Sequence, residues 1–288
     1  MGVPTFIMPQ FSLDSFCAAV QRHQITHVGV VPSILQALLS HPHVPAAYNL
    51  SSLQFMTSAA APLGADLVQA LYEKLRLRVG QGYGLTECSP ATHSQTWEEG
   101  PLYPGRVGRP LPNMTVRFVP VEDDGRSVDS RGEIWLKGPN VFLGYLGDEN
   151  ATRDHFSTDG FFKTGDVGFE DEHGNLVITG RIKELIKYDG NQVAPAELEG
   201  IALRHCAVSD VAVTGVQWVT PDRMETEAPA AFVVVRSGHI ADECTADTIR
   251  EFVDEQVESF KRLRGGVHFV SEIPRNAAGK ILRRKLQC

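Results

Sequence analysis

The chain has 288 residues, of which 42% are hydrophobic and 22% charged, a composition that suits a water-soluble globular protein with two domains. Its 35 acidic residues outnumber its 27 basic ones, and the net charge of -8 argues against a general nucleic-acid or anionic-membrane binder. The five cysteines are scattered without a C-x-x-C pair, a pattern typical of reduced thiols. The uncharged stretch between Arg22 and Asp66 contains histidine, proline and asparagine, so we interpret it as buried core and not as a membrane span.

The first 92 residues alternate short apolar runs with helical patterns, which predicts a parallel α/β layer. Strands are expected at residues 27–31 and 53–57, and helices at residues 33–40 and 65–76. In the second of these helices, apolar residues recur at steps of three and four, which predicts one buried stripe. Its expected members are Leu67, Ala70, Leu71 and Leu75.

From about Gly100 the sequence changes to short β-type runs separated by glycine and proline. Strands are expected at residues 115–119 and 133–136, and turns at residues 123–125 and 173–175. Residues 93–180 are therefore predicted to form a β-rich subdomain. Together with residues 1–92, it makes up the predicted large part of the chain, residues 1–180.

Residues 181–288 are predicted to form a separate small α+β domain. Its expected elements, in chain order, are a helix at 195–205, strands at 208–214 and 230–235, a helix from Thr245 to roughly Arg264, and a strand at 267–270.

Residues 81–87 read QGYGLTE and follow an apolar run. The glycines let the backbone approach a ligand, and Tyr83 offers a ring face on which a base can stack. Thr86 can bind a phosphate oxygen, and Glu87 can hold magnesium, which prefers carboxylate and phosphate oxygens. A structural turn between two strands explains the glycines equally well, and the string does not complete a G-x-G-x-x-G dinucleotide fingerprint.

Thr164-Gly165-Asp166 follows the aromatic run Phe161-Phe162. A carboxylate at this place can accept hydrogen bonds from both hydroxyls of a ribose. Taken singly, Asp166 is explained more simply as a turn residue or a helix cap.

Two further strings are rich in cations: residues 180–187 read GRIKELIK, and residues 274–285 read PRNAAGKILRRK. A solvated surface, or weak contact with polyanions, explains most basic runs. The glycine before Lys280 suggests instead a lysine that is delivered to a phosphate or a carboxylate.

These strings resemble the ordered motifs of the adenylate-forming (AMP-binding) superfamily, which includes acyl-CoA synthetases. The matching pieces occur in family order at residues 58–64 (SAAAPLG), 81–87, 164–166, 180–199 and 274–282. The run IKYDGNQVAPAELE at residues 186–199 is most similar to 4-coumarate:CoA ligase and its relatives. The resemblance implies a partial large domain of this family followed by its small C-terminal domain.

The resemblance implies an enzyme that uses ATP, Mg²⁺ and coenzyme A. The substrate carboxylate attacks the α-phosphorus of ATP to give acyl-AMP and pyrophosphate, and the coenzyme A thiol then attacks the activated carbonyl. The residues implied to contact the nucleotide are Gln81, Gly82 and Tyr83 at the adenine, Thr86 and Glu87 at the phosphates and magnesium, and Asp166 and Arg181 at the ribose.

The resemblance also implies a mobile small domain that turns about a hinge at Lys183. Lys280 would stabilise the transition state of adenylation and then withdraw. The face from Lys187 to Gln192 would be presented to the adenylate for the thiol step. Lys187 is the candidate catalytic residue of that face, and Gln192 is a candidate binding residue.

Two positions depart from the family pattern. Ala59 stands where the family usually has glycine, and its methyl group would narrow the space beside AMP and the acyl group. Asp189 stands where plant ligases usually have lysine, which replaces a cation useful to the coenzyme A phosphates with an anion.

Nothing in the sequence resembles the Thr/Ser/Gly-rich loop ending in Pro-Lys-Gly that grips the phosphates in this family. We therefore expect a truncated chain that begins inside the large domain, with exposed strand edges that favour instability or self-association. Two alternatives to an acid:CoA ligase stay open: a catalytically silent homologue that binds nucleotide or a partner protein, and an adenylation enzyme that loads a carrier protein.

The sequence also bears on location and partners. It begins without a secretory signal, and Leu286-Gln287-Cys288 differs from the Ser-Lys-Leu peroxisomal address. We expect a cytoplasmic protein, with the peroxisome as the alternative. The expected partners are a small carboxylic acid, ATP and coenzyme A, without nucleic acid.

Overall fold

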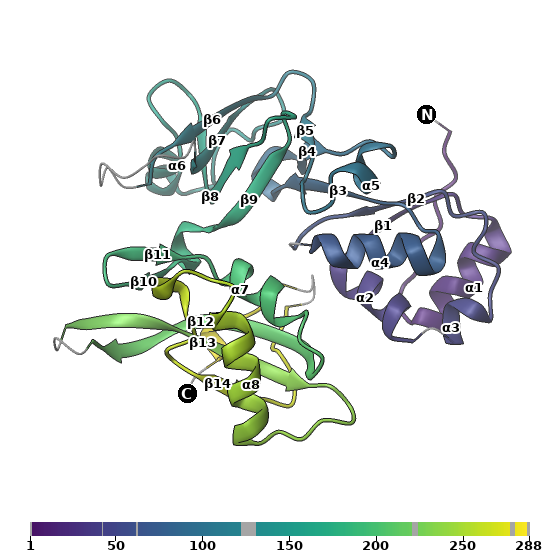
Figure 1. The fold of residues 1–288 in the computed structure, drawn as a ribbon. Coiled ribbons are helices and arrows are strands. Elements are labelled where there is room, and N and C mark those ends of the chain that lie inside the picture. The colour runs from purple at the N-terminus through teal and green to yellow at the C-terminus, as the bar shows by residue number, and fades with distance from the viewer. Residues whose placement is uncertain are drawn as a thin grey trace. The chain divides into compact units, whose positions relative to one another are not determined.

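A computed structural model describes residues 2–41, 43–61, 63–121, 131–220, 224–276 and 280–286 of the chain. The chain divides into two compact units, residues 1–112 with 172–176 and residues 113–171 with 177–288 (Figure 1). The mixed α/β class predicted from the sequence is confirmed. The predicted domain boundary between residues 180 and 181 lies inside the second unit and stays a prediction.

The first unit is built on a five-stranded sheet in the order β1-β2-β3-β4-β5. The first three strands are parallel, which confirms the predicted parallel layer, and the last two continue the sheet antiparallel. The strands are β1 (His27–Val30), β2 (Phe55–Ser58), β3 (Val79–Gly84), β4 (Ala91–Ser94) and β5 (Arg109–Pro110).

Five helices accompany this sheet: α1 (Leu13–His23), α2 (Pro32–Ser40), α3 (His43–Ala46), α4 (Ala65–Leu75) and α5 (Glu99–Leu102). α1 begins where the Ser12 hydroxyl accepts the Ser15 N–H at 3.1 Å, and α2 begins with Pro32, whose missing N–H costs nothing at a helix start. Side chains of α1 to α4 and of the parallel strands share one apolar core.

The buried stripe of α4 differs from the predicted one. Val68 and Leu71 are the buried residues of this helix, whereas Leu67 and Leu75 are only partly buried against the core. The helix is therefore rotated so that Val68, which the periodicity did not select, faces the sheet.

The second unit contains a four-stranded sheet in the order β6-β7-β8-β9. Its elements are β6 (Thr115–Val119), β7 (Gly132–Lys137), α6 (Glu149–His155), β8 (Phe162–Glu170) and β9 (Leu176–Arg181). This confirms the predicted β-rich part. The predicted turn at residues 173–175 is confirmed between β8 and β9, whereas the one at residues 123–125 lies outside the described residues.

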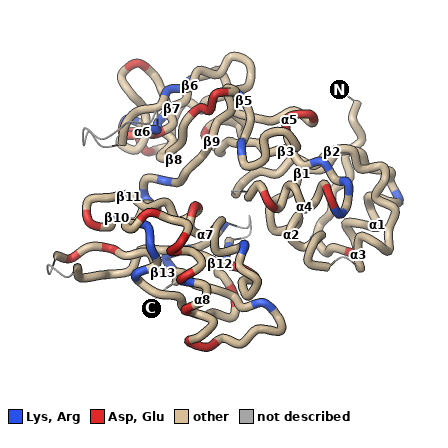
Figure 2. The backbone as a smooth tube through the Cα atoms, viewed as in Figure 1, with Lys and Arg blue, Asp and Glu red and all other residues tan. Residues whose placement is uncertain are grey.

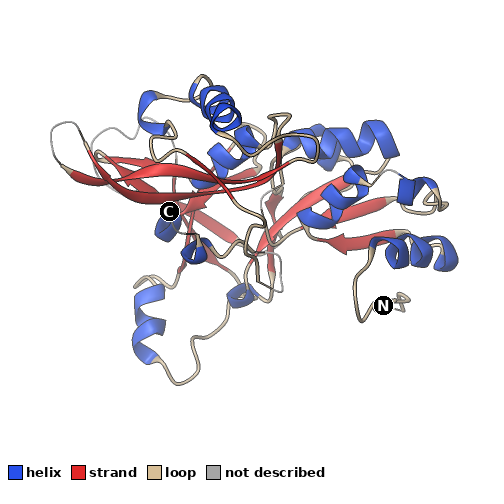
Figure 3. Ribbon diagram, turned by 90° about the horizontal axis from the view of Figure 1, so that it is seen from below, coloured by secondary structure: helices blue, strands red, loops and turns tan. Residues whose placement is uncertain are grey.

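The C-terminal part of the second unit combines a long antiparallel hairpin with helices, as predicted (Figure 3). β14 pairs parallel with β13, and β10 and β11 form a separate two-stranded ribbon. Its elements are η2 (Ile182–Glu184), β10 (Ile186–Tyr188), β11 (Asn191–Val193), α7 (Pro195–Ala202), β12 (Val208–Val219), β13 (Glu225–Val235), α8 (Glu243–Asp254), η3 (Ser259–Lys261), β14 (Val267–Phe269) and η4 (Arg283–Lys285).

One helix of this part is shorter than predicted. The sequence pattern predicts a helix that continues to about Arg264, but α8 ends at Asp254. The Asp254 carboxylate accepts the Leu263 N–H at 2.8 Å, so the chain folds back beside the end of the helix. A short 3₁₀ turn, η3, occupies the remainder.

Acidic and basic residues are interspersed along both units (Figure 2). Within the described ranges, no helix is long and apolar enough to cross a membrane.

Candidate functional site

The predicted site residues divide between the two units. Ala59 and residues 81–87 lie in the first unit, and those from Asp166 onward lie in the second. Each group is described within its own unit.

Residues 81–84 are not the turn that their glycines suggested, because they form the last part of strand β3. The glycines are needed for close approach of the neighbouring strand. A Cβ atom on Gly84 would lie 1.9 Å from the Pro90 carbonyl oxygen, and one on Gly82 would lie 3.2 Å from that of His93. The antiparallel return through β4 therefore explains both glycines without a ligand.

Two buried polar atoms stand where the parallel pairing of β2 with β3 ends. Ser58 and Gln81 are paired in register and are 2% and 4% exposed. Among the described residues, neither the Ser58 Oγ nor the Gln81 Nε2 has a hydrogen-bond partner. A buried polar group without a partner costs about 1–3 kcal/mol, so a polar ligand or an ordered water is expected to bind each of these atoms. Carboxyl ends of parallel strands are where open α/β sheets bind ligands.

Hydrogen bonds to Gln95 fix the backbone of Gln81, but they do not involve its side-chain Nε2. The Gln81 N–H donates to the Gln95 side-chain oxygen at 2.9 Å, and the Gln95 N–H donates to the Gln81 carbonyl at 2.9 Å. The Gln95 amide nitrogen also donates to the Tyr103 carbonyl at 2.8 Å. Gln95 thus holds the strand end in place.

Tyr83 is held by a polar pair on β4. The Thr92 hydroxyl donates to the Tyr83 carbonyl at 3.2 Å, and the His93 Nδ1 lies 3.0 Å from the same hydroxyl oxygen. The rings of Tyr83 and His93 lie 5.9 Å apart and tilted at 47°. Burial lowers the pKa of His93 to about 4, so the imidazole is neutral at pH 7.

Thr86 and Glu87 lie on the 3₁₀ turn η1 (Thr86–Cys88), directly after β3. The Thr86 side chain is exposed and Glu87 is half-buried. Among the described residues, no group of three or more His, Cys, Asp or Glu side chains could hold a metal ion by itself. A lone carboxylate fits Mg²⁺, which is commonly held by one or two carboxylates together with substrate phosphates.

Ala59 directly follows β2 and is exposed, beside the buried Ser58. The positive φ in this segment belongs to the next residue, Ala60, at 75°. Glycine at position 59 is therefore not required by backbone conformation, and the effect of the methyl group there is on space alone.

Asp166 lies within strand β8. The simpler explanation from the sequence, a turn residue or a helix cap, is therefore wrong. Its carboxylate is 4% exposed and binds Arg181 through both oxygens, at 2.5 Å to Nε and 3.4 Å to Nη2. Arg181, 42% exposed at the end of β9, is the accessible member.

The predicted hinge and thiol-step residues follow Arg181 directly. Lys183 is exposed on η2, and Lys187 and Gln192 are register partners in the β10–β11 ribbon. The turn of this ribbon contains Asp189 at φ 46° and Gly190 at φ 71°, the two positive values that a tight two-residue hairpin requires. Asp189 therefore fits the turn locally, although it places an anion there.

Lys280 follows residues 277–279, which lie outside the described residues. Its side chain is 45% exposed, and its Nζ lies 3.5 Å from Glu184 Oε1. Glu184 also lies 3.2 Å from Arg283 Nε, so the candidate catalytic lysine belongs to an ion-pair cluster.

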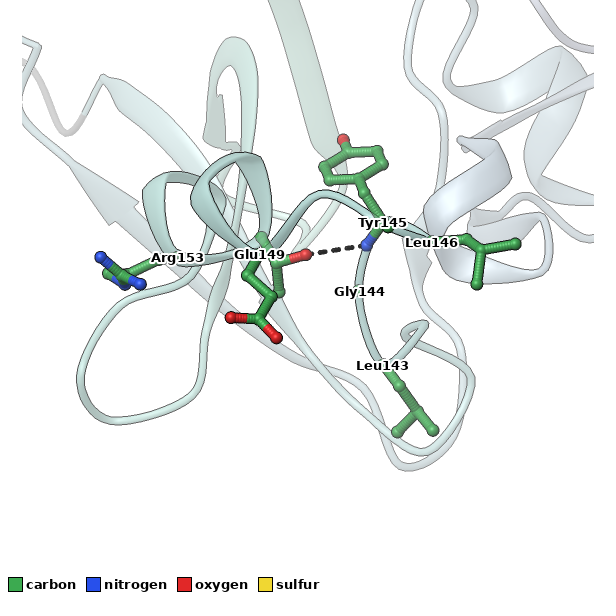
Figure 4. Close-up of a pocket in the computed structure, with 8 residues that line it drawn as sticks. Leu143, Gly144, Tyr145, Leu146, Glu149 and Arg153 are labelled. Atoms are coloured by element: carbon green, nitrogen blue, oxygen red, sulfur yellow. Dashed lines mark hydrogen bonds between the residues drawn. The ribbon is translucent and has the colours of Figure 1, made fainter.

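A surface hollow of about 550 Å³ lies in the second unit around Gly144 (Figure 4). Leu143 and Leu146 are fully exposed at its rim, and the Tyr145 N–H donates to the Thr152 hydroxyl at 2.9 Å. None of the predicted site residues lines it, so it adds nothing to the candidate site.

Several residues at these places were not predicted. Ser58, Thr92, His93 and Gln95 surround β3, and Glu184, Glu199 and Arg283 surround Lys280. The last three lie inside strings that the sequence singles out, and the mixture of acids with cations there was the available signal. Ser58 begins the SAAAPLG string at residues 58–64, which was the available signal for it. Thr92, His93 and Gln95 carry no signal, because isolated polar residues occur throughout the chain.

Comparison with known proteins bears on both units. Residues 1–146 match the family described as AMP-binding enzyme, and residues 197–280 match the AMP-binding enzyme C-terminal domain. The 4-coumarate–CoA ligase 1 of Glycine max is 39% identical over 98% of this chain and 95% of the relative. The 4-coumarate–CoA ligase 2 of Oryza sativa subsp. japonica is 38% identical over 99% of this chain, which spans 50% of the relative's length.

Solved structures agree with the sequence relatives. ATP-bound MatB from Rhodopseudomonas palustris is similar with a TM-score of 0.84 and 32% identity, over 97% of this chain and 53% of that chain. The predicted resemblance is therefore confirmed in sequence and in fold. The chain belongs to the family of AMP-binding enzymes.

Proposed function

We propose that this chain contributes to the ATP-dependent activation of a carboxylic acid and its transfer to coenzyme A, in the manner of an acid:CoA ligase similar to 4-coumarate–CoA ligases. The observation that carries the proposal is a pair of buried polar atoms without partners among the described residues, Ser58 Oγ and Gln81 Nε2, where the parallel pairing of β2 with β3 ends. The family match and the names of the relatives support the same reaction class.

The proposed adenine contacts are Gln81, Gly82 and Tyr83. Gln81 offers amide donors from a fixed strand end, and the half-buried Tyr83 offers a ring face. His93 stays neutral beside that ring, so no cation competes there with the groups that bind phosphate. Ala59 lies at the neighbouring strand end, where its methyl group limits the size of the acyl group.

The ribose contacts are proposed to be Asp166 and Arg181. The Arg181–Asp166 contact fixes the position of the carboxylate on β8. An ionised carboxylate forms stronger hydrogen bonds to hydroxyl donors than a neutral amide does, by about 1 kcal/mol or more.

In the proposed adenylation step, a new bond forms between the acid carboxylate and the α-phosphorus, and the bond to pyrophosphate breaks. Thr86 donates a hydrogen bond to a phosphate oxygen, and Glu87 is the carboxylate that would hold Mg²⁺. When bound, Mg²⁺ neutralises phosphate charge. Lys280 supplies a further fixed cation where negative charge develops on oxygen.

In the proposed second step, the thiol of coenzyme A attacks the activated carbonyl and AMP leaves. We place Lys187 and Gln192 on the face that serves this step, with Lys183 as the hinge. Lys187 is fixed at its backbone, because its N–H donates to Glu227 at 3.0 Å and its carbonyl accepts the Thr226 hydroxyl at 2.8 Å. Asp189 stands where a cation is expected at the coenzyme A phosphates. It therefore favours a variant of this step in which a carrier-protein thiol takes the place of coenzyme A.

A second function, nucleotide or partner binding without turnover, is the alternative. The chain spans 95% of the Glycine max relative, half the length of the rice relative and 53% of the solved MatB chain.

Exchange of labelled pyrophosphate into ATP separates the two functions. We expect exchange by the 288-residue chain to depend on an added acid from a panel of cinnamic, benzoic and fatty acids. Absence of exchange with every acid, together with measurable AMP binding, would support the silent function instead.

We further propose a cytoplasmic location and a tendency to self-associate. Cys17, Cys206 and Cys244 form no disulfide within the described residues, which suits a reducing compartment. Subcellular fractionation checks the proposed location.

A further inference from the structure

Glu184 on η2 contacts both cations that the C-terminal tail directs toward it. Its Oε1 lies 3.5 Å from Lys280 Nζ, and its Oε2 lies 3.2 Å from Arg283 Nε. The carboxylate thus bridges the candidate catalytic lysine and a neighbouring arginine. It also directly follows Lys183, the proposed hinge residue.

The backbone of Lys280 is fixed independently of this carboxylate. The Lys280 N–H donates to Asn276 Oδ1 at 2.9 Å, and the Asn276 N–H donates to the Lys280 carbonyl at 2.9 Å. Arg275, which bridges to Ile281, binds the Asp210 carboxylate of β12 at 2.9 and 3.1 Å. Without Glu184, the lysine side chain would be released while its backbone stayed in place.

Arg283 does not depend on Glu184 either. Its guanidinium is 16% exposed, and it donates through Nη1 and Nη2 to Glu199, with Nη2 at 3.2 Å. Nη1 also donates to the Val213 carbonyl at 2.7 Å. Among the described residues, Glu184 is the ion-pair partner of Lys280, so removing its charge affects Lys280 far more than the anchoring of the tail.

We propose that Glu184 is a positioning residue that holds the Lys280 ammonium against η2 until the adenylation step requires it. The inference rests on the proposed function of Lys280. An incoming phosphate or carboxylate oxygen has the same sign of charge as Glu184, so the two anions compete for one ammonium group. Because Glu184 belongs to the segment that contains Lys183, movement at this hinge also moves the carboxylate that holds the lysine.

The competition is expected to be modest, because Lys280 is 45% exposed and water screens the pair. An exposed ion pair shifts an equilibrium by at most about five-fold. A shift of this size tunes the availability of Lys280 without blocking the reaction.

The test measures how fast an amine-acetylating reagent modifies Lys280 in the 288-residue chain, read by mass spectrometry after digestion with a protease that does not cleave at lysine. We expect Glu184→Gln to accelerate modification of Lys280 by about two- to five-fold. Glu184→Asp, which keeps the charge, should be closer to the wild-type rate. In the pyrophosphate exchange assay, Glu184→Gln should raise kcat and leave KM for ATP unchanged.

Glu197→Gln is the matched control. It removes a carboxylate that lies 3.0 Å from Lys261 Nζ in the same unit, so it should leave the modification rate of Lys280 unchanged. Far-UV circular dichroism of each variant verifies that the fold is retained, and Glu184→Asp provides a second test if Glu184→Gln unfolds.

Equal modification of Lys280 in the wild type, Glu184→Gln and Glu184→Asp would overturn the inference, whether or not the chain adenylates an acid. If Glu184→Gln speeds the modification of Lys280 but slows pyrophosphate exchange, the proposal that Glu184 competes with substrate anions for the Lys280 ammonium is overturned. Faster modification with no exchange by any form of the chain would support the hold of Glu184 on Lys280 and count against the proposed function instead.

Discussion

Asp166 and His93 are buried polar side chains with different partners. The carboxylate of Asp166 is bound to the guanidinium of Arg181. His93 is buried next to a hydroxyl and an aromatic ring, so desolvation favours the neutral imidazole. One group is therefore suited to accept hydroxyl donors, and the other keeps positive charge away from Tyr83.

Asp166→Asn is expected to reduce the preference for ribose over deoxyribose. A hydrogen bond to a charged acceptor is stronger than one to a neutral amide, so the preference for AMP over 2′-deoxyAMP should fall by about ten-fold. Isothermal titration calorimetry with both nucleotides measures it without requiring turnover.

Asp159→Asn is the control for this experiment. Asp159 also pairs with an arginine, Arg117, at 2.8 Å, but it has no proposed ligand role. An equal loss of affinity for AMP and 2′-deoxyAMP in Asp166→Asn would contradict the ribose assignment.

His93 is expected to make the fold less stable in mild acid. Its folded pKa of about 4 lies below the ordinary value of 6.5, so between these values the unfolded chain binds a proton that the folded chain does not. Stability should fall as the pH drops, by about 2 kcal/mol between pH 7.5 and pH 5. Urea unfolding of the wild type and His93→Gln at both pH values measures this, and an identical loss in the two proteins would contradict it.

At the residue scale, the order of the motifs along the chain is enough to identify candidates such as Asp166 and Lys280. It places Ser58 at the start of the SAAAPLG string, but it could not show that this residue pairs with Gln81 across two strands. It could not assign partners to Arg283 either, because Glu199 is 84 positions away in the sequence. Contacts of this kind depend on tertiary folding, which local patterns do not encode.

The β3–β4 return is the element that shapes the nucleotide side of the candidate site. β3 ends with Gly84, where the backbone of Pro90 and Ala91 passes too close for any side chain. The same return places Thr92 and His93 against Tyr83. The stability of the first unit and the position of Tyr83 therefore both depend on the close approach of Pro90 and Ala91 to Gly84.

Gly84→Ala is expected to destabilise the first unit by about 1–3 kcal/mol, because the new methyl group forces the backbone of β4 to move. Gly200→Ala in α7 is the matched control, since no atom lies within 4 Å of the added Cβ, and it should stabilise the chain by up to about 1 kcal/mol. Equilibrium urea unfolding measures both, and a neutral Gly84→Ala would contradict the close approach.

At the element scale, hydrophobic periodicity predicted about half of the described strands and helices, including β6 with its observed ends, and it missed α1 and β8 among others. It failed where side-chain contacts end an element, as at Asp254, whose carboxylate takes the Leu263 N–H beyond the end of α8. It also misjudged glycine-rich residues 81–84, because glycine is required there by a neighbouring strand and not by a turn.

At the scale of the whole chain, strand β1 forms an edge of the first sheet, paired with β2. In the N-terminal segment, Val3, Phe6 and Ile7 expose 73%, 53% and 87% of their surface. An open strand edge and exposed apolar side chains each favour association between chains.

We therefore expect the apparent mass in sedimentation experiments to rise with protein concentration. Gly29→Lys should weaken this association, because it places a charge on the edge strand at a position where an added Cβ meets nothing within 4 Å. A mass that stays monomeric at all concentrations in the wild type would contradict the expectation.

The central claim, that this chain carries the lysine of an acid-activating site, is tested most directly by acid-dependent exchange of pyrophosphate into ATP with two single-lysine variants. Lys280→Ala should reduce exchange by about 100-fold or more, because it removes a fixed cation at the developing charge. Lys285→Ala, which removes an exposed lysine of the same tail from η4, should keep the wild-type rate. Exchange by Lys280→Ala at the rate of Lys285→Ala would contradict the account.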